Sequence, residues 1–126
     1  MENMAKKVLL VDDEPDVQRM IARRLQTEGY EVVTASDGDE ALKKALLEHP
    51  DVILMDVMLP KKSGNAVVAE LYENKATAKI PVIFITCLVD TGEASLMNYT
   101  SGGNHIMGKP IDTNRLIQMI QEAVAA

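Results

Sequence analysis

The sequence is poor in cysteine, in aromatic residues and in clustered positive charge. Cys87 is the only cysteine in 126 residues, so no internal disulfide can form, which favours a reducing, cytoplasmic location. The chain has three tyrosines, one phenylalanine and no tryptophan, too few for a platform that stacks nucleic-acid bases. A net charge of −6 without a basic stripe argues further against direct binding of nucleic acid or of an anionic membrane surface.

Long apolar runs are also missing, and the chain is short. No run approaches the roughly 20 apolar residues of a membrane-spanning helix or the core of a signal peptide. With 126 residues, 47% of them hydrophobic and 25% charged, the chain is long enough for one cored domain and too short for two. We therefore expect a single domain.

Short apolar runs alternate with stretches of helical spacing, the pattern of repeated β-α-β units around a parallel sheet. Strands are predicted at 8–11, 31–35, 51–55, 80–85 and 105–107. Helices are predicted at about 15–28, from 36 or 37 to His49-Pro50, after Gly64, softly within 90–104, and at 112–125. The clear helices carry the following apolar faces: Val17, Met20, Ile21 and Leu25; Ala41, Leu42, Ala45 and Leu46; Val67, Val68, Leu71 and Tyr72; Leu116, Ile117, Ile120 and Val124.

Polar groups follow the apolar runs at the points where strands would end. These groups are Asp12 and Asp13, then Asp56, Thr86 and Lys109. Because the carboxyl ends of parallel strands meet at one edge of a sheet, we expect them to form one site. The three carboxylates would repel one another unless a cation compensates. An all-oxygen site with room for water suits Mg²⁺ better than zinc.

Asp56, alone at the end of the central apolar run, is the carboxylate best placed to attack phosphorus. Covalent aspartyl-phosphate chemistry is an established use of this side chain. Phosphoryl transfer needs an aligned nucleophile and neutralised oxygens, which Mg²⁺, Lys109 and Thr86 could supply. If Asp12 and Asp13 merely capped the first helix, partners on other strands would not be required.

Four motifs, in order, resemble the receiver domains of two-component response regulators. They are Val-Asp-Asp-Glu at 11–14, the segment 50–64 around Asp56, Ile-Thr at 85–86 and Lys-Pro at 109–110. The resemblance covers essentially the whole chain and identifies residues 1–126 as a single receiver domain with no output domain present. It implies a flavodoxin-like α/β fold, a five-stranded parallel sheet of order 2-1-3-4-5 with five flanking helices. It also implies a cytoplasmic phosphorelay switch that assists its own phosphorylation and dephosphorylation and is not an enzyme.

The resemblance further implies a role for each site residue. Asp56 would be the phosphoacceptor, taking its phosphoryl group from a sensor histidine kinase or a phosphotransfer protein. Asp13, Asp56 and the backbone carbonyl of Met58 would hold Mg²⁺, with Asp12 acting through water. Thr86, Cys87 and Lys109 would line the phosphoryl and switch position, Cys87 as a small packing residue, and the peptide before Pro110 would be cis.

The chain departs from the family pattern at Ile106, where many receivers carry an aromatic ring that turns when the threonine moves. A β-branched side chain is stiff, which argues against the usual coupling and keeps open an alternative, a phosphorylation-independent interaction module. An aspartate-nucleophile phosphatase would need a second aspartate where this chain has Met58. Output is expected through the face of the fourth helix, fifth strand and fifth helix, to a downstream protein or in a weak homodimer.

Overall fold

The structure, a computed structural model of the chain, describes residues 6–56, 59, 62–86, 105–108 and 112–125. For Asn65, Thr86, 105–108 and Ala125 the description covers the backbone only. The strands are β1 (Lys7–Val11), β2 (Glu31–Ala35), β3 (Val52–Asp56), β4 (Val82–Thr86) and β5 (His105–Gly108). The helices within the described residues are α1 (Pro15–Thr27), α2 (Gly38–Glu48), α3 (Gly64–Glu73) and α5 (Thr113–Ala125).

The strands form one parallel sheet in the order β2-β1-β3-β4-β5. This confirms the predicted α/β class, the parallel sheet and its strand order. Since the order runs outward in both directions from β1, the chain reverses its direction of winding between β1 and β3. Open α/β sheets bind ligands at such a switch point, beyond the carboxyl ends of the strands.

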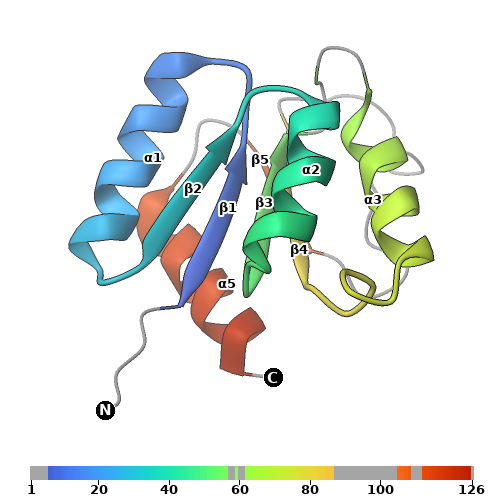
Figure 1. Cartoon of the computed structure of the whole chain (residues 1–126). Helices are drawn as coiled ribbons and strands as arrows, with labels where there is room; N and C mark the ends of the chain where they lie inside the picture. Colours follow the sequence, from blue (N-terminus) through green and yellow to red (C-terminus); the bar gives the residue numbers. More distant parts are fainter. Residues whose placement is uncertain (1–5, 57–58, 60–61, 87–104, 109–111, 126) are drawn as a thin grey trace.

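Helices cover both faces of the sheet, with α1 and α5 on one face and α2 and α3 on the other (Figure 1). Side chains of a strand alternate between the two faces. In β1, Val8 and Leu10 therefore pack in the α1–α5 core, while Leu9 and Val11 pack in the α2–α3 core. Because every strand residue from 8 to 11 is fully buried, β1 reads in sequence as one continuous apolar run.

The predicted helix faces are too wide at three positions. Met20 is 50% exposed, Leu46 42% and Tyr72 43%. The stripe of α1 that meets the sheet follows spacing of four, through Ile21 and Leu25, and leaves Met20 on the flank. On α2 the small residues at 41 and 45 face the core, and on α3 the buried row ends at 71.

Several strand boundaries also differ from the prediction by one or two residues. Asp56 is the last residue of β3 and not the first residue after it. β4 begins at Val82, because the amide of Ile80 is used in a turn that returns to the carbonyl of Thr77.

None of the helices in the described part of the chain has the length and apolar character that crossing a bilayer requires. The soft helix predicted within 90–104 lies outside the described residues.

The start of α2 is a reciprocal cap. Asp37 accepts a hydrogen bond from the backbone N–H of Glu40, and the Glu40 carboxylate accepts one from the N–H of Ser36. Asp37 is therefore the cap among the two residues that the sequence offered. The pKa of Glu40 is lowered, mainly by the hydrogen bond from the Ser36 N–H; burial opposes this effect, and Lys44 lowers the pKa further.

Candidate phosphoacceptor and metal site

Sheet register places two of the three predicted carboxylates on neighbouring strands. Val11 of β1 pairs with Met55 of β3, so Asp12 and Asp56 are the next residues along the two strands. They lie at the switch point of the sheet. Both side chains are buried, Asp12 with 1% and Asp56 with 4% of its surface exposed. Burial removes hydration from a carboxylate and therefore costs free energy unless another group compensates its charge.

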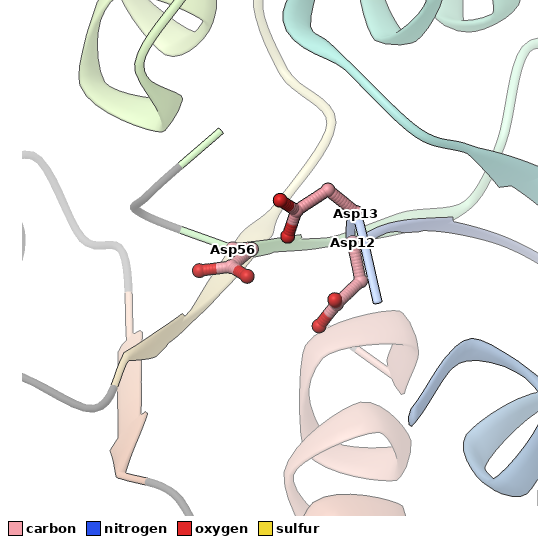
Figure 2. A group of neighbouring side chains, drawn as sticks. All are labelled: Asp12, Asp13 and Asp56. Carbon is pink, nitrogen blue, oxygen red and sulfur yellow. The ribbon is translucent and has the colours of Figure 1, made fainter. Parts of the chain in front are cut away.

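Asp13 completes the acidic cluster from the surface. One carboxylate oxygen from each of Asp12, Asp13 and Asp56 can be chosen so that all three lie within 4.8 Å of one another. Figure 2 shows Asp12 and Asp13 leaving adjacent positions in different directions, with the Asp13 carboxylate turned toward Asp56. The cluster therefore combines two buried carboxylates with one that is open to solvent.

The turn from β1 into α1 is fixed by hydrogen bonds on both sides of Asp12. Its backbone N–H donates to the carbonyl of Ala35 at 3.1 Å, and its carboxylate accepts from the N–H of Glu14 at 2.8 Å. The side-chain amide of Gln18 donates to the carbonyls of Asp12, at 2.8 Å, and Ala35, at 2.9 Å. Asp12 thus enters the cluster from a turn whose backbone is held in place.

Lys62, which precedes α3, lies close to the start of α2. A Cβ atom added to Gly38 would lie 2.5 Å from the Lys62 Cβ and 2.7 Å from its carbonyl oxygen. Lys62 also pairs with Glu70 of α3 and, at 3.9 Å, with Asp39. The hydrogen bond with Glu70 is the main reason that the pKa of Lys62 is raised.

The donor set of the cluster fits a small, hard divalent cation. Mg²⁺ prefers octahedral coordination by oxygen ligands at about 2.1 Å, so neighbouring ligands lie about 3 Å apart and opposite ligands about 4.2 Å apart. Because the three carboxylate oxygens lie within 4.8 Å of one another, movements of less than about 2 Å bring them to that spacing. The cluster has no histidine or cysteine, the ligands that zinc prefers.

The other predicted site residues are placed to different extents. Thr86 ends β4, where its backbone pairs with Gly108 of β5, and Ile106 pairs with Phe84. Thr86 is one residue beyond Ile85, the partner of Asp56, so the backbone brings it to the same edge of the sheet. The positions predicted for the metal carbonyl, the packing cysteine, the phosphoryl-contacting lysine and the cis peptide lie outside the described residues; they are Met58, Cys87, Lys109 and Pro110.

A family model matches most of the chain, including the three aspartates. Residues 8–121 match the model of the response regulator receiver domain. The chain belongs to the response regulator receiver family. Members of this family are signalling proteins of two-component systems and not classical enzymes.

Two curated relatives of this receiver chain are transcriptional regulators. The alkaline phosphatase synthesis transcriptional regulatory protein PhoP of Bacillus subtilis is 41% identical over 107 residues, covering 85% of this chain and 43% of the relative. A probable transcriptional regulator, ycf27, of Cyanophora paradoxa is 40% identical over 116 residues, covering 92% and 47%. The receiver chain thus spans less than half the length of these two relatives.

A solved structure supports the fold of the whole receiver. The receiver domain of the sensor histidine kinase PA1611 from Pseudomonas aeruginosa superposes with a TM-score of 0.88 at 28% sequence identity, covering 98% of this chain and 100% of that one. That crystal structure has a magnesium ion coordinated in its active-site cleft.

Two contacts, those of Gln18 and of Gly38, were not anticipated from the sequence. Gln18 reads as one polar residue of an amphipathic helix, and nothing in its neighbours indicates two backbone carbonyls within its reach. Gly38 follows a capping aspartate, which suggested only a helix start. Both contacts join segments that are far apart along the chain, so local sequence patterns carry no signal for them.

Proposed function

We propose that this receiver is a phosphoacceptor switch of a phosphorelay, modified on Asp56 in a Mg²⁺-dependent reaction. The observation that carries the proposal is the burial of Asp56 at the sheet switch point, with Asp12 and Asp13 close enough to share a cation. An isolated buried carboxylate would cost stability, whereas a carboxylate that must bind a metal and attack phosphorus needs such a setting.

In the proposed reaction a carboxylate oxygen of Asp56 attacks the phosphorus of a phosphohistidine on a sensor kinase or phosphotransfer protein. The new O–P bond forms as the P–N bond breaks, and the departing imidazole leaves with the electron pair of that bond and becomes protonated. Asp56 sits at the end of a fully buried strand, so its direction of approach is set by the sheet. The acyl phosphate that results carries the signal.

Mg²⁺ would be held by Asp13, Asp56 and the carbonyl of Met58, with Asp12 acting through water. When bound, it neutralises the carboxylates and the phosphoryl oxygens, as in other phosphoryl transfers. Asp12 is suited to an indirect role, because one of its oxygens already accepts the Glu14 N–H. Asp13 is suited to direct contact, because its carboxylate is exposed and turned toward Asp56 (Figure 2).

Thr86 and Lys109 would contact the phosphoryl group, with Cys87 packed beside them and the peptide before Pro110 cis. Phosphorylation can change output only if two conformations differ in their affinity for the phosphoryl group. The proposed output surface is the face of β5, α5 and the segment between β4 and β5, read by a downstream protein or a second copy. The competing function is a phosphorylation-independent interaction module, because β5 carries Ile106 where many receivers carry an aromatic ring.

The test is intact-mass analysis after incubation with a small acyl phosphate, with and without Mg²⁺. We expect one phosphoryl adduct that needs Mg²⁺ and is lost in Asp56→Asn. Asp51→Asn is the matched control, because Asp51 lies just before the same strand and an asparagine oxygen can still accept the Lys7 N–H. No adduct under conditions that modify another receiver would contradict the proposal and favour the module that acts without phosphate.

A further inference from the structure

The side-chain amide of Gln18 holds the peptide group that joins the two aspartates at the end of β1. Its nitrogen lies 2.8 Å from the carbonyl oxygen of Asp12 and 2.9 Å from that of Ala35, within hydrogen-bond distance of both. The two hydrogens of one NH₂ group can serve both acceptors. Gln18 therefore ties the end of β1, the end of β2 and the first turns of α1 together.

The first of these carbonyls belongs to the peptide plane between Asp12 and Asp13. Peptide groups are planar, so the direction of the Asp12 carbonyl fixes the direction of the Asp13 N–H and the position of the Asp13 Cα. The N–H of Asp12 is held by Ala35 at 3.1 Å, which fixes the preceding plane. Gln18 supplies the restraint on the following plane, from which the exposed Asp13 side chain departs.

Gln18 is itself well anchored for this role. Its backbone N–H donates to the carbonyl of Glu14 at 3.0 Å, within the first turn of α1. The neighbouring residues Val17 and Ile21 pack in the core under α1, which fixes the rotation of the helix. The Gln18 side chain is partly buried, so its hydrogen bonds are protected from competition by bulk water.

We infer that Gln18 is a positioning residue for the divalent cation, one that acts on Asp13 through the Asp12–Asp13 peptide. This inference rests on the proposed function, since it concerns the same site. Residues that orient metal ligands typically change metal affinity 10- to 100-fold when they are replaced. Gln18 acts on the backbone of a ligand and not on its carboxylate, so the expected effect is at the lower end, roughly tenfold.

The experiment compares Mg²⁺ affinity in the parent, Gln18→Met and Gln26→Met. Methionine resembles glutamine in size and lacks hydrogen-bond donors, and Gln26 is an exposed residue of the same helix. Mg²⁺ dissociation constants are measured by titration of the backbone amide signals of Asp13 and Asp56, with folding checked by circular dichroism. We expect roughly tenfold weaker binding in Gln18→Met and less than a twofold change in Gln26→Met.

A second readout separates positioning from a merely structural role. If Gln18 only stabilises the fold, the folded fraction of Gln18→Met binds Mg²⁺ as the parent does and phosphorylates with the same Mg²⁺ dependence. If it positions Asp13, the Mg²⁺ concentration for half-maximal phosphorylation rises, while the rate at saturating Mg²⁺ stays within about twofold of the parent. Equal half-maximal concentrations in folded parent and variant would overturn the inference.

The unmutated chain provides a check that does not depend on the folding of a variant. The side-chain NH₂ protons of Gln18 should exchange with solvent more slowly than those of the exposed Gln26. Equal exchange rates would show that the contact is not maintained and would also overturn the inference. If the parent neither binds Mg²⁺ nor accepts phosphate, the proposed function itself fails. If the parent does both and Gln18→Met has the same Mg²⁺ affinity, only the inference about Gln18 fails.

Discussion

Replacing Asp13 with asparagine should stabilise the fold without Mg²⁺ and abolish most of the stabilisation that Mg²⁺ provides. The carboxylates of Asp12, Asp13 and Asp56 offer oxygens within 4.8 Å of one another. Two unit charges 4.8 Å apart repel by about 0.9 kcal/mol in bulk water and by about 3.5 kcal/mol at an effective dielectric constant of 20. Asparagine keeps the shape of the side chain and removes its charge.

The repulsion of about 0.9 kcal/mol per pair applies best here, because the Asp13 side chain is exposed and its charge is screened by solvent. Asp13→Asn removes two such repulsions, so we expect the free energy of unfolding to rise by about 1–2 kcal/mol in EDTA. For a domain of this length, 1 kcal/mol corresponds to a shift in Tm of about 4 °C. The expected increase in Tm is therefore about 4–8 °C.

Mg²⁺ should remove most of this difference in stability. A cation at ten times its dissociation constant stabilises the parent by about 1.4 kcal/mol, through preferential binding to the folded state. Asp13→Asn loses a charged ligand and should gain less than about 0.3 kcal/mol at the same concentration. The stability advantage of the variant in EDTA should then largely disappear.

The assay is thermal and urea unfolding of both proteins at low ionic strength, in EDTA and in a Mg²⁺ series. Asp16→Asn is the control, because Asp16 is an exposed residue of the adjacent helix turn that pairs with Arg19 and lies outside the cluster. It should lose a few tenths of a kcal/mol and respond to Mg²⁺ as the parent does. The reasoning is refuted if Asp13→Asn is no more stable than the parent in EDTA, or if its Mg²⁺ response is unchanged.

Two further predictions concern the start of α2. Gly38→Ala should lower the free energy of unfolding, measured in urea, by about 1–3 kcal/mol, because the added Cβ would meet the Lys62 backbone. Gly29→Ala is the control: its Cβ would enter open space at φ +94°, so backbone strain alone should lower stability by about 1 kcal/mol. An unchanged stability of Gly38→Ala would disprove the contact. Because the folded pKa of Glu40 is depressed, its contribution is present above its ordinary pKa of 4.5 and is lost as pH falls through the folded value. Glu40→Gln should therefore lower stability at pH 7 and flatten its acid dependence, unless the Ser36 contact is absent in solution.

The class of fold, the strand order and the residue types of the candidate site were predicted from sequence patterns and family motifs. Uninterrupted runs of four apolar residues, 8–11 in β1 and 52–55 in β3, are typical of strands that are buried on both faces in a parallel sheet. Asp12, Asp13 and Asp56 were identified because polar residues directly after such runs must surface at one edge. Family membership confirmed the receiver interpretation, while the individual roles of the site residues stay predictions.

The sequence erred where helix periodicity alone chose the buried face. It placed Met20, Leu46 and Tyr72 inward, although all three are between 42% and 50% exposed. Periodicity gives the direction of an apolar stripe and not its width, which depends on how closely each helix approaches the sheet. The small residues Ala41 and Ala45 fill that space under α2 and leave Leu46 outside.

The contacts that hold the carboxylates in place depend on the packing of segments that are distant in the chain. Asp56 lies close to Asp12 because β1 and β3 are hydrogen-bonded neighbours. Their paired positions Leu10 and Leu54 have 43 residues between them in the sequence. Gln18 reaches the end of β2 because β1 and β2 are also neighbours in the sheet. Hydrogen bonds and close packing act over a few ångströms in space, whereas patterns in a sequence report only neighbours along the chain, so the chemistry of this site was visible in the sequence and its geometry was not.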